Sequence, residues 1–360
     1  MPHGTAARRV NTGTAARWAL AVQSAWLTRG LLARLLWPLS VVFGGVSAVR
    51  RLIYRLGWRQ ATRLPVPVVV VGNLVAGGAG KTPTVMAIVQ LLSSRAYSPG
   101  IVSRGYGRSA DGSALIRRGD SASTCGDEPL LMHLRLCVPV CVGRDRVEAG
   151  RLLLRHHPEV DVLVSDDGLQ HLALARDAQV LVFDERGAGN GWLLPAGPLR
   201  ESLPESVPAR SVVLYNAVAP TTPLPGALAL PSLAGVVALD AWWRGEPATP
   251  AQLHALRGRP VLATAGLARP QRFFEMLSAA GLSVTTQPLP DHHNYTALPW
   301  PADTADVVVT EKDAVKLDPA RMGSTRVWVA TLDFVPDAAF ETALLALLPP
   351  PGTRHGNTPA

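Results

Sequence analysis

The chain has 360 residues, enough for two globular lobes, and with 48% hydrophobic against 17% charged residues it is apolar for a soluble protein. Its three cysteines are odd in number and lack a second ligand cluster, which argues against a disulfide framework and a zinc site and fits a reducing cytoplasm. The net charge of +8 conceals an asymmetry, because residues 1–110 hold 14 Lys and Arg but no acid, and the remainder is net acidic. We therefore expect the N-terminal part to meet a polyanion, and the apolar sequence between its arginines favours an anionic membrane surface over nucleic acid.

The segment from residue 26 to residue 58 is rich in Leu, Val, Trp and Ala. Its uncharged run, residues 35–49, is short for a bilayer crossing, and Pro38 and a Gly-Gly pair interrupt it. We expect a partly inserted or interfacial hairpin or helix; a helix buried against the C-terminal lobe and an organellar transit peptide are the alternatives. A signal peptide is not expected, because the run starts late and no cleavage motif follows. Arginines and aromatic residues that suit the headgroup zone follow the run at helical spacing: Arg51, Tyr54, Arg55, Trp58 and Arg59.

Residues 68–71 are four consecutive valines, which predict a strand buried on both faces. A glycine-rich turn ending in Gly-Lys-Thr follows, and apolar spacing predicts a helix over 84–95. Strand, glycine loop and helix are the context of a phosphate-binding loop, in which Lys81 reaches the β- and γ-phosphates and the Thr82 hydroxyl ligates Mg²⁺. Val75 stands where the strict motif has glycine, and a glycine-rich turn with a surface lysine is the alternative. The expected nucleotide-binding residues of this segment are Asn73, Gly77, Gly78, Ala79, Gly80, Lys81 and Thr82.

Further strands are predicted at 99–102, 138–142, 160–165, 178–183 and 211–215, with helical or loop stretches between most of them. A second α/β set follows, with strands at 260–265, 283–288, 306–310 and 327–330 and a helix near 271–280. Alternation of this kind predicts a P-loop NTPase-like α/β fold, a mostly parallel sheet with helices on both faces and a second, smaller α/β lobe.

The same patterns divide the chain into five parts. We expect an N-terminal extension and membrane-associated helical segment over 1–63, a P-loop kinase core over 64–215 and a C-terminal α/β lobe over 236–348. Residues 216–235 hold four prolines and little periodicity, which indicates a connector. Residues 349–360 are expected to form a disordered tail.

Two adjacent acids, Asp166 and Asp167, follow the apolar strand at 160–165. Because ligands gather at the carboxyl ends of parallel strands, and P-loop enzymes hold Mg²⁺ with an aspartate at a strand tip, the pair is expected at the metal. An ordinary Asp-Asp-Gly turn is the alternative. His171, close behind, either contacts substrate or holds the loop.

Asp127 and Glu128 precede a predicted helix, where they either cap it or help to position and deprotonate an attacking hydroxyl. Arg200 offers a counter-charge to a transferring phosphoryl group. In Asp291-His292-His293 we expect one histidine to work with a carboxylate, since adjacent side chains point apart.

Three other residues lie in weaker motifs. Arg104 and Tyr106 occupy a Gly-rich turn after a strand, where they offer phosphate and sugar contacts or simply form a solvated loop. Lys312 follows the strand at 306–310 and either reaches the nucleotide or belongs to a solvated charged turn.

In this order, the motifs resemble those of the tetraacyldisaccharide 4′-kinase family of the lipid A pathway of Gram-negative bacteria. The resemblance spans roughly residues 26–345, and the family's loop also lacks the strict first glycine. It implies transfer of the ATP γ-phosphoryl group to the 4′-hydroxyl of a tetraacylated disaccharide 1-phosphate at the cytoplasmic face of the bacterial inner membrane. The segments that carry it are 72–74, 77–83, 103–108, 126–129, 166–171, 197–201, 291–292 and 310–316.

The resemblance also implies ATP and Mg²⁺ as cofactors and a role for each matched residue. Asp127 and His292 look like the pair that activates the hydroxyl, and Lys81 and Arg200 look like phosphoryl stabilisers. His293 matches no fixed residue type and is assigned no role. The remaining implied roles are metal binding by Thr82, Glu128, Asp166 and Asp167, nucleotide binding by Lys312, and substrate binding by Arg104, Tyr106 and His171.

Two other functions compete with this interpretation. One is a small-molecule P-loop kinase whose N-terminal segment is only a core helix. The other is a membrane-attached NTPase switch, although the guanine-reading Asn/Thr-Lys-x-Asp motif is missing and residues 310–313 are only faintly similar to it. The expected partners are the acylated disaccharide lipid and an anionic inner-membrane surface; neither nucleic acid nor an obligate protein partner is indicated.

Overall fold

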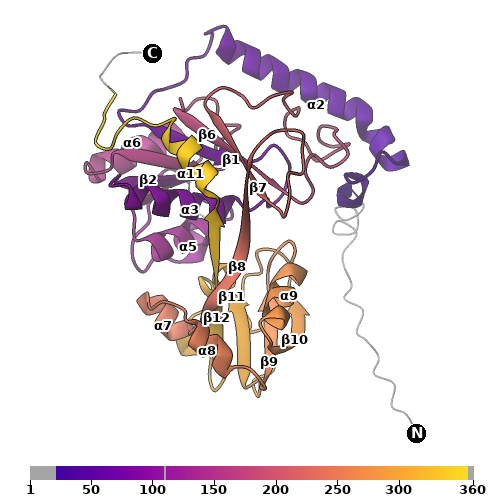
Figure 1. Cartoon of the computed structure of the whole chain (residues 1–360), viewed down its shortest axis with the longest axis vertical. Helices are drawn as coiled ribbons and strands as arrows, with labels where there is room; N and C mark the ends of the chain where they lie inside the picture. Colours follow the sequence, from indigo (N-terminus) through magenta and orange to yellow (C-terminus); the bar gives the residue numbers. More distant parts are fainter. Residues whose placement is uncertain (1–21, 109–110, 356–360) are drawn as a thin grey trace.

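The computed structural model describes residues 22–108 and 111–355, in which two lobes share one 12-stranded sheet (Figure 1). The strand order is β10-β9-β11-β12-β8-β7-β6-β1-β5-β2-β4-β3. All pairs are parallel except β8 with β12 and β3 with β4, so the expected mostly parallel sheet is confirmed. The strands are β1 (Val68–Gly72), β2 (Pro99–Ser103), β3 (Ala114–Leu115), β4 (Val140–Val142), β5 (Val162–Asp166), β6 (Ala178–Asp184), β7 (Ser211–Asn216), β8 (Ala227–Ala238), β9 (Pro260–Ala265), β10 (Ser283–Pro288), β11 (Asp306–Thr310) and β12 (Arg326–Pro336). The helices are α2 (Leu31–Arg55), α3 (Lys81–Ser94), α4 (Ala122–Cys125), α5 (Asp127–Leu136), α6 (Arg146–His156), α7 (Leu239–Arg244), α8 (Pro250–Ala255), α9 (Gln271–Ala279), α10 (Glu311–Ala314), a 3₁₀ turn (Pro319–Arg321) and α11 (Ala338–Leu345).

The first strand lies in the middle of the N-terminal lobe, between β5 and β6. Its valines alternate between two hydrophobic clusters: Val69 and Val71 pack on the side of α3 and α5, and Val68 and Val70 pack on the opposite side with α6. All four side chains are buried, which explains why this strand reads as an unbroken apolar run instead of an alternating one.

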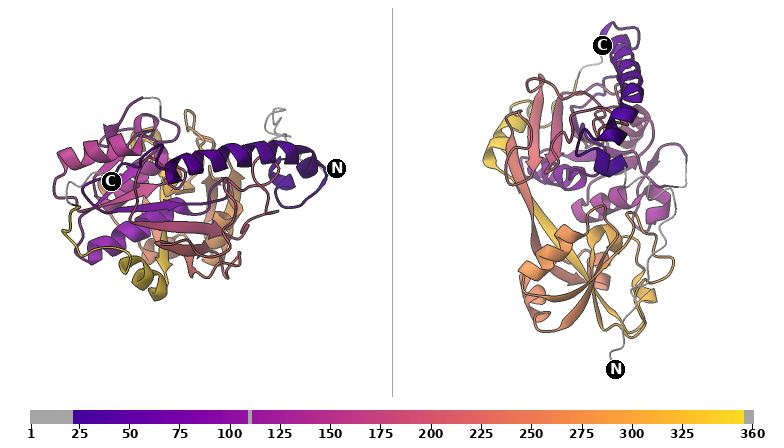
Figure 2. Two further views of the ribbon diagram at one scale, coloured as in Figure 1. Left: turned by 90° about the horizontal axis from the view of Figure 1, so that it is seen from above. Right: turned by 90° about the vertical axis from the view of Figure 1, so that its right-hand side faces the viewer.

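Two long strands join the lobes, and here the sequence interpretation needs correction. Residues 227–235, expected to belong to an irregular connector, form most of β8, which pairs in parallel with β7 at Leu214↔Ala227 and then antiparallel with β12. The two strands run from one lobe into the other (Figures 1 and 2). Pro231 does not prevent this strand: it pairs with Phe334 of β12 in the partly exposed part of β8, beyond the residues Ala227 and Leu228 that pair with β7, so it lies where β8 has a free edge among the described residues.

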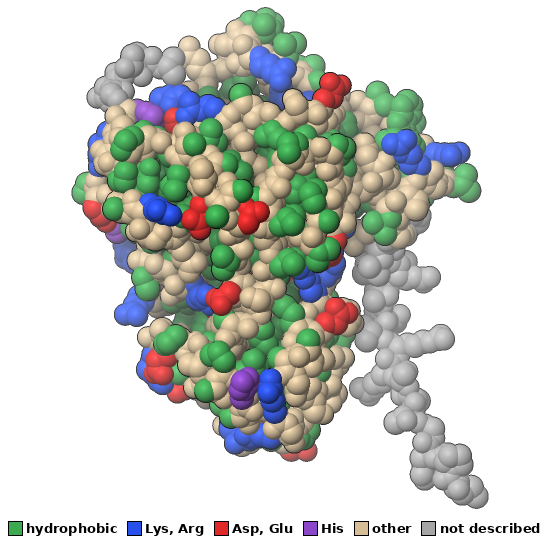
Figure 3. All heavy atoms as spheres, viewed as in Figure 1, with side chains coloured by type: hydrophobic (Ala, Val, Ile, Leu, Met, Phe, Trp, Pro, Cys, Tyr) green, Lys and Arg blue, Asp and Glu red, His purple; other side chains and the backbone are tan. Residues whose placement is uncertain are grey.

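The apolar N-terminal segment forms the continuous helix α2, not a hairpin. Pro38 and the Gly44-Gly45 pair lie inside this helix and do not interrupt it. It touches the core along a narrow face: the Ser40 hydroxyl donates to the Leu193 carbonyl at 2.8 Å, and a Cβ on Gly44 would lie 2.7 Å from the Leu193 side chain. Of its 25 residues, Ala33 and Ser40 are the two that are buried, so the alternative of a helix buried against the C-terminal lobe is wrong. By length and composition alone, α2 could cross a membrane. Its exposed apolar residues and arginines project along the upper edge of the molecule (Figure 3).

The C-terminal tail also differs from expectation. Residues 349–355 are hydrogen-bonded to the N-terminal lobe, where the Tyr97 hydroxyl donates to the Pro349 carbonyl at 2.7 Å and the Gly352 amide donates to Asp161 at 2.8 Å. The expected disorder is therefore wrong for these residues, because backbone groups of the tail find partners that a composition-based reading does not see. Residues 356–360 lie outside the described part of the chain.

Candidate active site

The glycine-rich loop between β1 and α3 has the conformation of an anion-binding turn. Gly77 and Gly80 have φ angles of 94° and 85°, in the left-handed region, and Gly80 is the N-cap of α3. The Lys81 ammonium donates to Asn73 Oδ1 at 3.1 Å and lies 3.5 Å from Asp167 Oδ1. Asn73 Nδ2 in turn donates to the Gly77 carbonyl at 3.0 Å, so this buried amide ties the lysine to its own loop.

Val75 has a structural reason to replace the expected glycine. It is 1% exposed and forms an antiparallel bridge with Leu199. The Ala76 amide donates to the Pro198 carbonyl and the Arg200 amide donates to the Leu74 carbonyl, each at 2.7 Å. The motif at 197–201 therefore lies along the loop and delivers Arg200 to its edge.

The twin aspartates differ in their surroundings. Asp167 is held by Lys81 and by Arg200, whose Nη1 lies 3.1 Å away, and although burial opposes them these two cations lower the pKa of Asp167. Asp166 is buried; burial and the charges of Glu128 and Asp167 raise the pKa of its carboxyl group. The Ser103 hydroxyl donates to Asp166 Oδ2 at 3.0 Å, whereas the buried Asp166 Oδ1 has no hydrogen-bond partner among the described residues.

These donors fit a divalent cation. Asp166 Oδ1 is a buried carboxylate oxygen without a hydrogen-bond partner among the described residues, and the carboxylates of Glu128 and Asp167 are close enough to raise the pKa of Asp166. A cation would compensate this negative charge, and Mg²⁺ prefers oxygen ligands of this kind. Thr82, at the start of α3, follows Lys81 directly. Within residues 22–108 and 111–355, no group of three or more His, Cys, Asp or Glu side chains forms a complete metal cage by itself. A magnesium ion in this position needs the phosphates and water as its other ligands.

Asp127 and His292 meet across the two lobes. Asp127 opens α5, and His292 lies in the loop between β10 and β11, where its Nδ1 is 2.9 Å from Asp127 Oδ2. This hydrogen bond raises the pKa of His292 above its ordinary value. Burial opposes the charge on Asp127, but the contact with His292 and the charges of Lys312 and Lys316 lower the pKa of its carboxyl group.

Lys312 lies beside this pair. Its Nζ is 2.9 Å from Glu128 Oε1 and 3.3 Å from His292 Nε2. Burial opposes its charge, yet Glu128 and Asp291 raise its pKa, so it stays protonated. The structure thus places Lys312 and Glu128 with the Asp–His pair, and Glu128 in turn close enough to Asp166 to affect its ionisation.

The expected substrate-binding residues lie on two sides of this centre. Tyr106 is 70% exposed, and its ring centroid is 5.5 Å from that of His292. Arg104 is also exposed and directly precedes the buried Gly105. His171 is half-buried with Nε2 3.8 Å from Asp145 Oδ1, and burial lowers its pKa. His293, which was given no role, packs edge-on against Tyr295 with centroids 4.8 Å apart.

Sequence reasoning missed Arg186, which braces the phosphate-binding loop. Its guanidinium donates to the Ala76 and Gly78 carbonyls at 3.3 and 3.0 Å and to Asp184 at 3.0 Å. Asp184 also accepts a hydrogen bond from Arg269 of the C-terminal lobe. The Asp184 carboxylate therefore links the C-terminal lobe to Arg186 and, through it, to the phosphate-binding loop. A signal was available, because Asp184, Glu185 and Arg186 follow a predicted strand at the edge where ligands gather.

Arg146 was missed as well, and here the sequence held no signal. An arginine at the start of a helix reads as exposed, but Arg146 is 4% exposed and its Nε has no partner among the described residues. Burial lowers its pKa, while nearby Asp166 and Asp167 oppose this. It therefore brings a buried cation to the twin aspartates.

Comparisons with known proteins agree on one family. The family model described as Tetraacyldisaccharide-1-P 4'-kinase matches residues 32–349. The chain is 56% identical over 335 residues to the tetraacyldisaccharide 4'-kinase of Methylibium petroleiphilum, covering 92% of this chain and 94% of the relative. It is 54% identical over 342 residues to that of Leptothrix cholodnii, covering 94% and 98%. The fold is similar to the crystal structure of "apo" form LpxK from Aquifex aeolicus in complex with ATP, with a TM-score of 0.73 and 27% identity over 89% of this chain and 100% of that one.

Proposed function

Because this chain belongs to the tetraacyldisaccharide-1-P 4'-kinase family, we propose that it transfers the γ-phosphoryl group of ATP to the 4′-hydroxyl of a tetraacyldisaccharide 1-phosphate. The product is the 4′-phosphorylated lipid of lipid A biosynthesis. The observation that carries the proposal at the site is the contact between Asp127 and His292, which supplies a proton acceptor. Lys312 lies beside it and pairs with Glu128, whose charge in turn affects Asp166, the neighbour of the Asp167 that contacts Lys81 of the loop.

The loop and its cations bind the triphosphate. In the proposed complex the amides at 77–82 surround the phosphates, and Lys81 and Arg200 neutralise charge that develops on the transferring group. Their present partner, Asp167, keeps both side chains at the loop edge before ATP arrives. Support for ATP as the nucleotide comes from the Aquifex aeolicus LpxK structure, which was determined in complex with ATP.

Proton removal falls to the Asp–His pair. Since His292 Nδ1 is engaged by Asp127, Nε2 is the atom left to accept the proton of the 4′-hydroxyl. The ammonium of Lys312 lies 3.3 Å from Nε2, where its charge opposes protonation and offsets part of the effect of Asp127. Tyr106, whose ring lies near that of His292, and Arg104 border the position from which the sugar approaches. His171 lies near Asp145 and near Arg146, the buried cation that interacts with the twin aspartates.

Magnesium, when bound with ATP, neutralises phosphate charge. Thr82, Glu128, Asp166 and Asp167 are the residues that would hold it. The chain's own contribution is the buried, unpartnered oxygen of Asp166 and the salt bridge by which Lys312 positions Glu128.

Helix α2 supplies the membrane attachment. Its apolar face is exposed, and arginines follow at its C-terminal end, as expected for a segment whose end lies among anionic headgroups. An acylated acceptor stays in the leaflet, so a kinase attached to the cytoplasmic face of the inner membrane can reach its sugar. We therefore place the enzyme there.

Incubation of the full-length protein with γ-³²P-labelled ATP and the disaccharide lipid, followed by chromatography of the lipid fraction, tests this function. Label should appear in a single new lipid and require the acceptor, and the Lys81→Ala variant should give none above background. ATP hydrolysis without lipid labelling would contradict the proposal and favour an NTPase switch.

A further inference from the structure

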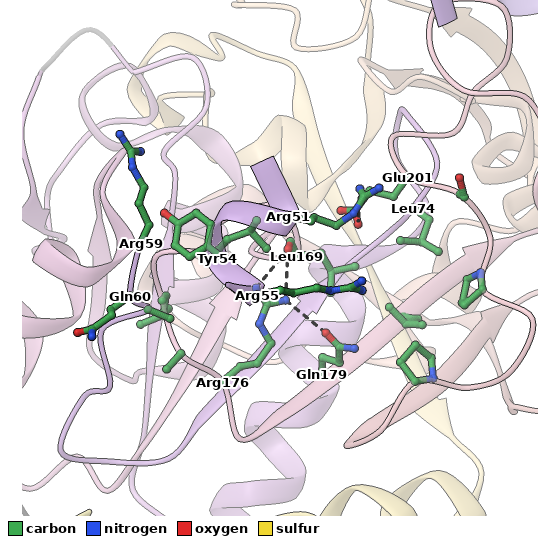
Figure 4. A pocket seen from close by; sticks show the side chains of 18 of the residues that line it. Arg51, Tyr54, Arg55, Arg59, Gln60, Leu74, Leu169, Arg176, Gln179 and Glu201 are labelled. Atoms are coloured by element: carbon green, nitrogen blue, oxygen red, sulfur yellow. Dashed lines mark hydrogen bonds and ion pairs between the residues drawn. The ribbon is translucent and has the colours of Figure 1, made fainter. Parts of the chain in front are cut away.

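A cavity of about 900 Å³ lies between the C-terminal half of α2 and the sheet, on the face away from α3 (Figure 4). Its floor is apolar, and its walls carry an excess of positive charge. The leucines of the floor are Leu74, Leu169, Leu172, Leu174, Leu181 and Leu203, and the cations are Arg51, Arg55, Arg59, Arg63 and Arg176.

Most of this charge is not neutralised by the protein. Among the lining residues, all of which belong to the described part of the chain, Glu201 is the one carboxylate, and it pairs with Arg51 at 3.4 Å. Arg63 is paired with Asp177 at 2.9 Å.

Three guanidinium groups remain without a carboxylate partner. Those of Arg55 and Arg59 have no hydrogen bond or ion pair with any described residue. Arg176 is partly buried and donates to neutral acceptors, the Leu169 carbonyl at 3.2 Å and Gln179 Oε1 at 3.3 Å. Arg55 and Arg59 are exposed and solvated, whereas Arg176 is partly buried, and burial lowers its pKa. Together they form a positively charged rim beside an apolar floor, which an anionic headgroup can complete.

We propose that this cavity binds an anionic glycerophospholipid of the membrane, with its phosphate among Arg55, Arg59 and Arg176 and its chains on the leucine floor. The combination of an apolar floor and unpaired cations selects this class of ligand. A free phosphate would leave the leucine floor in contact with water, a neutral lipid would leave the arginines without a counter-charge, and a nucleic acid has no acyl chain to bury on the leucines. The exposed apolar residues of α2 that precede these arginines place the cavity mouth at the level of the headgroups.

The proposed lipid is distinct from the reacting acceptor. Lys81, Asp127 and His292 are not among the lining residues. Gln170 separates the cavity edge from the catalytic carboxylates, since its amide donates to Glu201 at 3.1 Å while its oxygen accepts from Arg200 at 3.3 Å.

Titration of the full-length protein in neutral detergent with dioctanoyl phosphatidylglycerol tests the proposal, read out as the thermal unfolding midpoint. The midpoint should rise saturably, whereas dioctanoyl phosphatidylcholine and inorganic phosphate should have little effect. The Arg55→Gln/Arg59→Gln variant should weaken the apparent affinity about thirtyfold. Arg34→Gln is the control for charge loss on α2: it removes one positive charge, against two in the cavity variant, from an exposed site outside the cavity, so it should titrate like the wild type.

Three outcomes would overturn the proposal: equal responses to the two phospholipids, a rise with inorganic phosphate alone, or equal losses in the cavity variant and in Arg34→Gln. A fourth concerns the acceptor. If phosphatidylglycerol raises the KM for the disaccharide lipid competitively, the cavity belongs to the acceptor and not to a second lipid. Because the main readout is unfolding and not turnover, failure here leaves the kinase activity a separate question.

Discussion

His292 Nδ1 lies 2.9 Å from Asp127 Oδ2, although 165 residues separate them along the chain. The bond crosses from a loop of the C-terminal lobe to the first residue of α5. The two lobes must therefore stay in this arrangement for the proposed proton acceptor to exist, which makes the relation between the lobes part of the chemistry.

The first prediction concerns pH. If His292 accepts a proton, it must be neutral, so kcat/KM should fall as pH drops through its raised pKa. Asp127→Asn removes the carboxylate that raises this pKa, so the acidic limb should move to lower pH while the plateau rate falls at least tenfold. Profiles of kcat/KM for the wild type and the variant check both effects.

Asp291→Asn is the control for this measurement, because Asp291 lies 4.0 Å from His292 and has a smaller influence on its pKa. Its limb should shift less than that of Asp127→Asn. An acidic limb that stays in place in Asp127→Asn would show that His292 is not the titrating group.

The second prediction concerns Lys81. Replacing it with alanine removes the ammonium that lies beside Asn73 and Asp167 at the loop, and kcat should fall about 100- to 1,000-fold. Circular dichroism should show an unchanged fold. The comparison variant is Arg95→Ala, which removes a cation from the end of the same helix and should turn over normally. Near-normal turnover by Lys81→Ala would refute the phosphate role.

The third prediction compares two glycines of the loop. A Cβ on Gly80 would lie 2.4 Å from Asn216 Nδ2, and its φ of 85° disfavours any other residue, whereas a Cβ on Gly78 meets nothing within 4 Å. Gly80→Ala should therefore lower the free energy of unfolding by about 1–2 kcal/mol or more, and Gly78→Ala by much less. Urea titrations of both variants without nucleotide measure the difference; equal losses would mean that the loop does not hold this conformation.

The fourth prediction concerns Arg186, whose guanidinium holds two carbonyls of the loop. Arg186→Ala should raise the KM for ATP about tenfold, because a brace worth roughly 1–2 kcal/mol is lost, and should leave the KM for the lipid nearly unchanged. Arg244→Ala, an exposed arginine of α7 with its own ion pairs, serves as the control. A rise in the lipid KM alone would place Arg186 at the acceptor.

The fifth prediction separates a buried ion pair from an exposed one. Arg135 Nη1 lies 2.6 Å from Glu311 Oε1, and burial raises the pKa of Glu311 even in this contact. Arg135→Ala leaves that carboxylate with neutral partners, the Trp242 indole and the backbone of Leu332, so it should lower the free energy of unfolding by about 3 kcal/mol at neutral pH.

This loss should shrink as pH falls, since Glu311 in the variant can then fold in its protonated form. The Arg95–Glu341 pair is the exposed counterpart, with side chains 56% and 36% exposed, and Arg95→Ala should cost less than about 1 kcal/mol. Equal effects of the two substitutions would mean that Glu311 is not desolvated.

The sequence by itself determined the local elements and their chemistry. Valines on consecutive positions, glycines before a lysine and acids after a strand are patterns within ten residues, and they placed β1 and the twin aspartates at the end of β5. The helix expected over 84–95 begins earlier, at Lys81, because the glycine loop ends directly at its first turn. Strands β9, β10 and β11 have the expected bounds as well. For β9 and β11 the reason is a short apolar run with clear ends, whereas β10 is a largely exposed strand rich in Thr.

Only the tertiary structure decided which of these groups meet. The pairing of Asp127 with His292, the position of Lys312 beside them and the brace from Arg186 all join residues more than 100 positions apart or in separate elements. Such contacts depend on strand order and on how the lobes pack, which no local periodicity encodes. The same reason explains β8 and the ordered tail. The partner of β8 is the backbone of β12, and the partners of the tail include the side chains of Tyr97 and Asp161, so composition favoured a connector and disorder where the folded chain supplied hydrogen bonds.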